Sequence, residues 1–507
     1  MSEIEETVFA FDAAKDFEGL QNYFLGSKEP PHVFAGAVWS LLDKQRVRSA
    51  YLISKLLHIK GAVNPIMALA IYLGATDVGN TEDAELGRHI LRHLFNRQSP
   101  QDQELTRRAL EPFILNELSA ALAEPDLSPR MLRLLSILKE IVPEFRTLFD
   151  LTAPAPPFDV KALSEAGRAR AKLVPVSLPP AGTPRRRRRA IVAIRELFFP
   201  QFKNSRVFES GPTIVAAMKA YGWNASFVGM KFDKQEENDC RVIVETCIRE
   251  KAEVLVLDAV ILHFPAYLHI LADLRVQMPN LKIVGYYFDA WPIKTAQLKR
   301  DSILLDLVWT INPGLDAWNE PELVGKVFAA PFPRGGDYGG PILPLLPKMT
   351  FIGGVAGYNW HRAIWIAAMR SERLPVESHM TEFTHDGLTP VESYLLYMRR
   401  LADSRCSLNF SMRGNMAFIV TGRTFEVLSA GALLVQERCP EMDCYFIEGE
   451  HYLPFTTFAD LRSVAKFIQD NPEEAEDIRR KGNAFFRERY IDDKLMAYLD
   501  QRLFSPM

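Results

Sequence analysis

Hydrophobic residues recur at three- and four-residue steps through residues 1–150, as in AGAVWSLLDKQRVRSAYLISKLL and ELTRRALEPFILNELSAALAE. This spacing places apolar side chains on one face of a helix. Short breaks separate the helical stretches, at Pro30-Pro31, Asn64-Pro65, Ser99-Pro100 and Ser128-Pro129. Because proline and its neighbours interrupt helices, we predict an all-α domain of antiparallel, repeat-like helices over residues 1–150.

Further along the chain the pattern changes to short, continuous apolar runs, namely AIVAI, EVLVLDAVI, KIVGYYF and LVWTIN. Amphipathic segments such as GPTIVAAMKAYG and YLHILADLRVQM lie between them. Continuous apolar runs indicate strands buried on both faces, as in a parallel sheet covered by helices. We therefore predict a first Rossmann-like lobe over residues 189–345.

The same alternation restarts after the Pro-rich segment APFPRGGDYGGPILPLLP. Here MTFIGGV, CSLNFSM, ALLVQ and HYLPF are the predicted strands, and helices are expected to begin at His361, Val391, Thr424 and Asp460. A second Rossmann-like lobe over residues 346–507 follows. The predicted fold class is therefore α/β, with two Rossmann-like lobes preceded by an all-α domain.

The stretch between the helical domain and the first lobe, residues 151–188, is expected to be a linker. It consists of DLTAPAPPFDV and VSLPPAGTPRRRRR around a short helical segment. Pro-rich stretches of this kind are typical of connections between folding units. The run from Arg185 to Arg189 is interpreted as a solvated charge run before a strand, and we assign it no function.

Composition narrows the function classes. A formal net charge of -3 argues against a surface built for nucleic acid. The five cysteines are odd in number and match no zinc framework, which favours a reducing compartment. The acidic amino terminus lacks an apolar signal segment, so we expect a cytoplasmic protein. The apolar runs are shorter than the roughly 20 residues that cross a bilayer, while peripheral membrane contact is left open.

The segment SLNFSMRGNMAFIVTGRTFEVLSAGALLVQE carries the main candidate chemistry. A helix is expected to open near Thr421, capped by Thr421 or Thr424. The start of a helix exposes unpaired N–H groups that attract a diphosphate, and Arg423 adds a planar fork of donors. Glu426, one turn further on, is placed to accept hydrogen bonds from ribose hydroxyls. The alternative is that Arg423 and Glu426 form a surface pair.

The run R-T-F-E-V-L-S-A-G-A-L-L-V resembles the R-x-F-E-x-L-A-x-G-x-x-L element of the group 1 nucleotide-sugar glycosyltransferases, particularly the spore-maturation-type branch. The resemblance covers residues 349–495 and continues more weakly over 190–345. It implies the two-lobed fold called GT-B, with the donor nucleotide on the second lobe and the acceptor on the first. Many relatives carry a glutamate pair spaced E-x7-E, but Phe418 occupies the first position here, so a retaining mechanism is left open.

Three further places are candidates because ligands bind beyond the ends of parallel strands. Gly353 and Gly354, followed by Arg362, resemble the family's phosphate-side loop, although tight turns also need glycine. Asp289 follows a first-lobe strand and is a candidate general base or sugar ligand; the alternative is a turn residue. Glu196, at the end of the first strand of that lobe, is a candidate for serving the acceptor.

Together these features predict a glycosyltransferase that moves a sugar from a nucleotide-diphosphate donor to a protein, glycan or lipid-linked acceptor in an interlobe cleft. We expect no separate cofactor and no metal, because no D-x-D occurs and His89 with His93 lacks an evident third ligand. The helical domain is expected to dock the acceptor or a partner. Two alternatives are a non-catalytic scaffold with a partner-binding helical domain and a nucleotide-sugar epimerase or hydrolase.

Overall fold

The computed structural model describes most of the chain, in ranges separated by gaps. These are residues 3–27, 33–43, 46–59, 64–97, 139, 144–174, 187–198, 205–207, 210–231, 236–258, 265–287, 295–314, 316–334, 345, 348–353, 360–379, 390–412 and 418–504. They divide into two compact units. One unit comprises residues 1–153 with residues 362–372, and the other comprises residues 154–361 with residues 373–507.

The first unit is helical where it is described. Its helices are α1 (Glu3–Ala14), α2 (Phe17–Gly26), α3 (Phe34–Asp43), α4 (Val47–Ile59), α5 (Pro65–Asp77), α6 (Thr81–Arg97) and α9 (Glu144–Leu148). α5 is apolar on nearly all sides because α4 and α6 both pack against it. The expected helical character is confirmed here, while the segment ELTRRALEPFILNELSAALAE lies outside the described residues.

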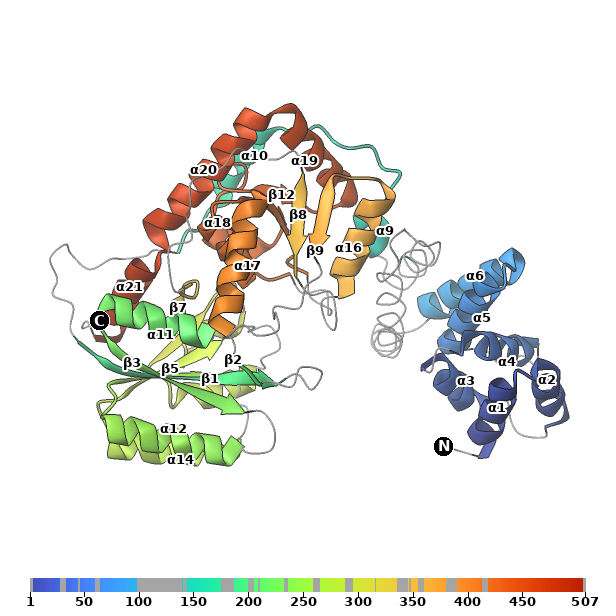
Figure 1. Cartoon of the computed structure of the whole chain (residues 1–507), viewed down its shortest axis with the longest axis horizontal. Helices are drawn as coiled ribbons and strands as arrows, with labels where there is room; N and C mark the ends of the chain where they lie inside the picture. The colour runs from blue at the N-terminus through green and yellow to red at the C-terminus, as the bar shows by residue number, and fades with distance from the viewer. Residues whose placement is uncertain are drawn as a thin grey trace. The chain divides into compact units, whose positions relative to one another are not determined.

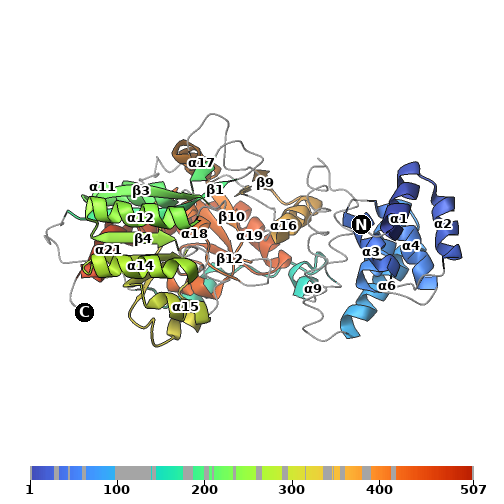
Figure 2. The same ribbon diagram turned by 90° about the horizontal axis from the view of Figure 1, so that it is seen from below.

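The second unit begins with a largely parallel sheet, which forms the first lobe. Its strands are β1 (Arg189–Phe198), β2 (Ser205–Val207), β3 (Asn224–Lys231), β4 (Val254–Asp258), β5 (Lys282–Tyr287), β6 (Leu307–Thr310) and β7 (Val327–Ala329). The parallel order is β3-β1-β4-β5-β6-β7, and β2 pairs antiparallel with β1. Helix α11 (Ser210–Tyr221) covers one face, and α12 (Glu236–Glu250) and α14 (Pro265–Gln277) lie side by side on the other (Figures 1 and 2). The short helices α15 (Thr295–Ser302) and η2 (Asp316–Asn319) follow.

The continuous apolar run of β1 explains why helices cover both faces of this sheet. Successive side chains of a strand point to opposite faces. Val192 and Ile194 therefore join the core beneath α11, whereas Ile191 and Ala193 join the core beneath α12 and α14. All four side chains are at most 1% exposed.

A second parallel sheet forms the second lobe. Its strands are β8 (Met349–Ile352), β9 (Val376–His379), β10 (Cys406–Asn409), β11 (Leu433–Glu437) and β12 (Leu453–Phe455), in the order β12-β11-β10-β8-β9. The helices of this part of the chain are α16 (Trp360–Ser371), α17 (Pro390–Ser404), α18 (Gly422–Ser429), α19 (Phe458–Asp470) and α20 (Pro472–Arg489), with the short helix η4 (Pro440–Cys444). Of α16, all but the first two residues belong to the unit of the N-terminal helices. Four of these helices begin within two residues of the expected positions, so the predicted fold class is confirmed.

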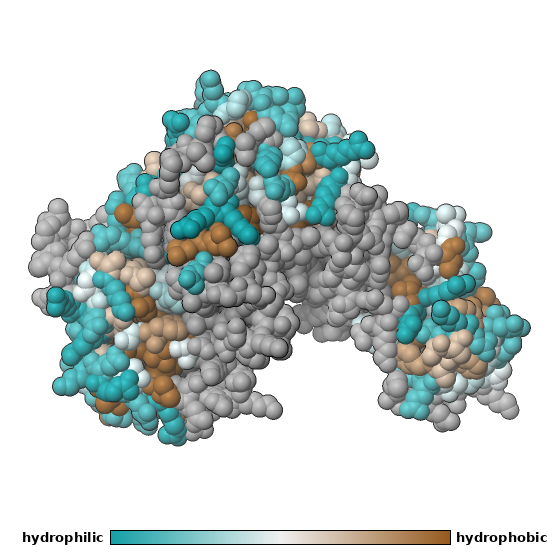
Figure 3. Space-filling model, viewed as in Figure 1, coloured by the Kyte–Doolittle hydropathy of each residue, from teal (hydrophilic) through white to brown (hydrophobic). Residues whose placement is uncertain are grey.

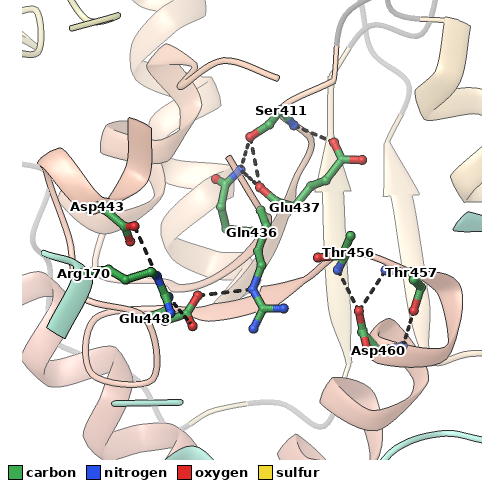
Figure 4. Close-up of polar contacts among 10 residues, drawn as sticks. Arg170, Ser411, Gln436, Glu437, Asp443, Glu448, Thr456, Thr457 and Asp460 are labelled. Atoms are coloured by element: carbon green, nitrogen blue, oxygen red, sulfur yellow. Dashed lines mark hydrogen bonds and ion pairs between the residues drawn. The ribbon is translucent and has the colours of Figure 1, made fainter. Parts of the chain in front are cut away.

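The local sequence explains where the outer helix α19 of this lobe begins and why α20 can face the solvent. Thr457 and Asp460 form a capping box at the start of α19 (Figure 4), which satisfies amide groups that would otherwise lack partners. α20 carries many charged residues, and the surface around α19 and α20 is largely hydrophilic (Figure 3). No described helix has the length and apolar character needed to cross a membrane.

The last helix, α21 (Asp492–Phe504), packs against the first lobe although it follows the second in sequence. The rings of Tyr498 and Phe328 are 5.0 Å apart. Arg188 pairs with Asp500 at 3.3 Å, and its guanidinium lies 3.5 Å from the ring centre of Phe504. One arginine of the run between Arg185 and Arg189 is therefore an anchor for α21.

The predicted linker, residues 151–188, contains α10 (Val160–Arg170), which packs on the second lobe. Arg170 pairs with Glu448 at 2.6 Å (Figure 4), and Ser164 Oγ donates to Glu450 at 2.9 Å. The chain beyond α10 donates backbone hydrogen bonds from residues 172 and 174 to the carbonyls of residues 443 and 444, both at 2.8 Å. Gly167 lies so close to Glu448 that a Cβ would be 2.9 Å from its carbonyl oxygen.

We predict that a chain shortened to begin at Pro154 is more stable than one beginning at Arg185. The longer form retains α10 and its contacts, whereas the shorter form exposes the surface that α10 covers. A loss of about 1 kcal/mol in the free energy of unfolding lowers the melting temperature of a domain of this size by about 2–4 °C. The measurement is the melting temperature of both chains by circular dichroism. Equal values would show that α10 is a tether without a stabilising role.

Candidate functional site

The second sheet contains a point where the strand order reverses. β8 has β9 on one side and β10 on the other, so the connections leave in opposite directions. In such sheets ligands bind outside the carboxyl ends of the strands at the reversal. Gly353 follows β8 directly, and Ser411 follows β10 by two residues. These two strand ends define the candidate site.

Helix α18 begins beside these strand ends. Thr421 is its N-cap residue, as expected, but the Thr421 side chain makes no capping hydrogen bond. Its hydroxyl instead accepts a hydrogen bond of 3.0 Å from Asn409 Nδ2. The expected capping by a threonine side chain is therefore wrong for Thr421, because a buried amide on β10 competes for the hydroxyl.

Arg423, in the first turn of α18, lies against the end of β8. Its guanidinium carbon is 5.4 Å from the ring centre of Phe351, and its Nε donates to the hydroxyl of Tyr397 at 3.2 Å. Its Nη1 is buried and has no hydrogen-bond partner among the described residues. A Cβ on Gly353 would lie 2.5 Å from Nη2, so only glycine allows the guanidinium to approach this closely.

Glu426 has protein partners on both carboxylate oxygens. Oε1 accepts from Arg334 Nη1 at 2.9 Å, and Oε2 accepts from the hydroxyl of Tyr397 at 2.8 Å. The hydroxyl of Tyr397 thus lies between Arg423 and Glu426, in place of the surface pair considered as the alternative. Each oxygen keeps a further lone pair, so these contacts leave the expected role of Glu426 towards ribose untested.

Arg334 comes from the segment that follows β7 and is 6% exposed. Its Nη2 donates to the carbonyl of Gly422 at 3.0 Å, and its backbone N–H donates to Asp492 at 2.8 Å. Burial disfavours the cation, but the Tyr394 hydroxyl and Glu426 outweigh this effect and raise the pKa of Arg334. The side chain therefore remains charged and holds the start of α18.

Thr424 is fully buried and belongs to a polar network beneath α18. Its hydroxyl donates to Gln436 Oε1 and accepts from Asn409 Nδ2, both at 3.1 Å. Gln436 Nε2 continues to Ser411 Oγ at 2.7 Å (Figure 4). The proposed contact of Thr424 with a donor is therefore corrected: its hydroxyl faces the sheet and fixes α18 there.

Glu437, at the end of β11, orders the chain that leaves β10. Its Oε2 accepts from the backbone N–H of Ser411 (Figure 4) and from that of Met412, both at 2.8 Å. Glu441 of η4 joins the two lobes, because it accepts from Asn312 Nδ2 at 2.9 Å and from the N–H of Val420 at 3.0 Å. Burial raises the pKa of Glu441.

The structure does not test whether the remaining expected residues belong to this site. Arg362 lies in α16, is 6% exposed and belongs to the compact unit of the N-terminal helices. Gly354 and Asp289 lie outside the described residues, as does the side chain of Glu196, whose backbone pairs with residue 207. Among the described residues, no group of three or more His, Cys, Asp or Glu side chains could hold a metal ion.

Sequence reasoning missed three residues of this site, namely Tyr397, Arg334 and Asn409. Tyr397 lies in a helix whose YLLY pattern is equally typical of a core face, and Arg334 stands in a Pro- and Gly-rich segment without periodicity. The one available signal was the polar Asn409 within the predicted strand CSLNFSM, since a buried amide needs partners.

Comparisons with known proteins agree with the resemblance carried by the motif around Arg423. Residues 355–500 match the family model described as "Glycosyl transferase-like", which confirms that resemblance for the second lobe. A comparison with curated proteins found no match.

Several solved structures are similar over 63% of this chain. HepE of Anabaena in complex with UDP and glucose is 10% identical with a TM-score of 0.41, and all of that chain is covered. Sucrose-phosphate synthase of Thermosynechococcus elongatus is 12% identical with a TM-score of 0.41, again with all of that chain covered. An E. coli structure described as trehalose-6-phosphate bound with UDP-2-fluoro glucose is 11% identical with a TM-score of 0.38, and 99% of that chain is covered.

We predict that Gly353→Ala displaces Arg423 while leaving the fold intact. The new methyl group would clash with the guanidinium, which is the far end of a flexible side chain and can move aside. Because φ of Gly353 is +158°, which other residues rarely adopt, the expected result is a slightly lower melting temperature together with weaker binding of nucleoside diphosphates, measured by calorimetry. Gly26→Ala is the control, since a methyl group on Gly26 would have no other atom within 4 Å. Unchanged nucleotide binding in Gly353→Ala would remove Gly353 from the site.

Proposed function

We propose that this protein is a glycosyltransferase that uses a nucleotide-diphosphate sugar. The observation that supports it most is the guanidinium of Arg423, which has a buried nitrogen without a described partner and lies at the reversal point of the second sheet. Arg423 also stands in the first turn of α18, where the helix dipole favours anions. The match of residues 355–500 to a glycosyl transferase-like family adds to this argument.

The proposed reaction breaks the bond between the anomeric carbon and the diphosphate oxygen, and a bond forms from an acceptor oxygen to that carbon. The nucleoside diphosphate leaves with the bonding electrons, and the acceptor hydroxyl loses its proton to a base. Arg423 and the amide groups at the start of α18 stabilise the growing charge on the diphosphate. Asp289 and Glu196 stay candidates for the base or for acceptor contacts.

The donor itself carries the sugar, so the proposal includes no separate cofactor. It also includes no metal, because a guanidinium and a helix amino terminus can balance the charge of the diphosphate. We further propose that the N-terminal helices dock the acceptor, whether protein, glycan or lipid-linked, since stacked helices offer an extended surface.

We predict that UDP, GDP, ADP or dTDP raises the melting temperature of the wild-type protein, because a ligand that binds only the folded state stabilises it. At 100 times the dissociation constant the gain is about 2.7 kcal/mol. Arg423→Ala should lose most of this shift. Arg438→Ala is the matched control, because Arg438 is also in the second lobe but pairs with Glu448 at 3.2 Å.

The outcomes separate the candidate functions. Absence of binding by all four nucleotides would favour the non-catalytic scaffold. Conversion of the sugar nucleotide without any acceptor would favour the epimerase or hydrolase. Equal loss in Arg423→Ala and Arg438→Ala would show that charge in general, and not the site at α18, attracts the nucleotide.

We also predict that sugar transfer persists after treatment with EDTA. The measurement is transfer from labelled nucleotide sugars to a candidate acceptor, before and after the chelator and again with added Mg²⁺ or Mn²⁺. Loss of transfer with EDTA and its recovery with a divalent ion would overturn the metal-independent scheme.

A further inference from the structure

We propose that Tyr397 is a positioning residue that orients Arg423 towards the diphosphate, and that Glu426 serves as the anchor of Tyr397. This inference rests on the proposed function, because it names how the same donor site is organised. The inference is argued from a chain of three hydrogen bonds. Arg334 contacts Glu426 at 2.9 Å, Glu426 contacts Tyr397 at 2.8 Å, and Tyr397 contacts Arg423 at 3.2 Å.

The hydrogen bond between Arg423 and Tyr397 involves Nε, the guanidinium nitrogen that is bonded to the aliphatic part of the arginine side chain. Nε donates to the tyrosine hydroxyl, and this fixes the plane of the guanidinium. The two terminal nitrogens, which form the outer edge of the fork, are then left at the end of β8 beside Gly353. Two parallel donors in a fixed plane suit phosphate oxygens.

The direction of the hydrogen bonds depends on the protonation of Tyr397. Burial raises the pKa of its hydroxyl, and Arg423 opposes this shift only in part. The hydroxyl therefore keeps its proton and donates it to Glu426 Oε2 at 2.8 Å. A lone pair of the same oxygen is then available to accept from Arg423, so one hydroxyl serves both neighbours.

Glu426 is held in turn by Arg334, which stays protonated because its pKa is raised. Arg334 is 6% exposed and also bonds the carbonyl of Gly422, so it is fixed to the first turn of α18. Arg334 bonds one oxygen of Glu426, and Tyr397 bonds the other. The carboxylate of Glu426 consequently orients the tyrosine and leaves Arg423 without a neutralising carboxylate partner among the described residues.

The test is Tyr397→Phe, which keeps the ring packed against Tyr394 and removes only the hydroxyl. The probe is whichever of UDP, GDP, ADP and dTDP binds the wild-type protein most tightly by calorimetry. We expect about tenfold weaker binding, the size expected for a hydrogen bond to a charged group. Tyr490→Phe is the control. Tyr490 is 1% exposed, and its hydroxyl donates to the carbonyl of Tyr445 at 3.4 Å, a contact that does not involve Arg423.

A double variant tests whether the hydroxyl of Tyr397 acts through Arg423 or has only a structural role. In the Arg423→Ala background, Tyr397→Phe should weaken binding no further, because its effect acts through the guanidinium. Full additivity of the two substitutions, or wild-type affinity of Tyr397→Phe, would overturn the positioning role. Unchanged binding in Arg423→Ala alone would instead overturn the proposed function, so the two failures are distinguishable.

The role assigned to Glu426 has its own readout. Glu426→Gln keeps an oxygen that accepts from Tyr397 or Arg334 but loses the charge. If Glu426 acts as an anchor, Glu426→Gln should weaken the binding of inorganic pyrophosphate as well as that of the nucleoside diphosphate. A loss seen for the nucleoside diphosphate but not for inorganic pyrophosphate would assign Glu426 to the ribose and overturn this part of the proposal.

Discussion

The ion pair between the buried Arg334 and the half-buried Glu426 is the contact on which the candidate site depends. It joins the segment after β7 to the first turns of α18, and Arg334 adds a hydrogen bond to the carbonyl of Gly422. A charge in such a position is costly unless it is paired, and removal of one partner of a buried pair typically costs about 3–5 kcal/mol. The start of α18 is therefore held by charge as well as by apolar packing.

The polar network beneath α18 fixes the same helix from the side of the sheet. Asn409 on β10 bonds Thr421, Thr424 and Gln436, and every one of these side chains is buried. A buried network with its hydrogen bonds satisfied is rigid, because a shift of any member leaves polar groups without partners. Arg423 thus stands on a fixed base, which is the condition for binding a ligand in one orientation.

The carboxylates near the site bond groups other than Arg423. Glu426, Glu437 and Glu441 each accept hydrogen bonds from the protein, the last two mainly from backbone N–H groups and an amide. Arg423 contacts a neutral hydroxyl and an aromatic ring instead. The site consequently keeps a positive group for an anion, although the whole chain carries a formal net charge of -3.

The alternation of strands and helices, the helical region before it, and the candidate site residues Arg423 and Gly353 could all be predicted from the amino-acid sequence. Continuous apolar runs and helical periodicity are local patterns, so they can be read without a structure. The polar edge strand β9 and the half-exposed β3 lack such runs and went unnoticed. The contact of Arg334 with Glu426, 92 residues further along the chain, could not be predicted in this way, because contacts between distant residues follow from packing and leave no local pattern.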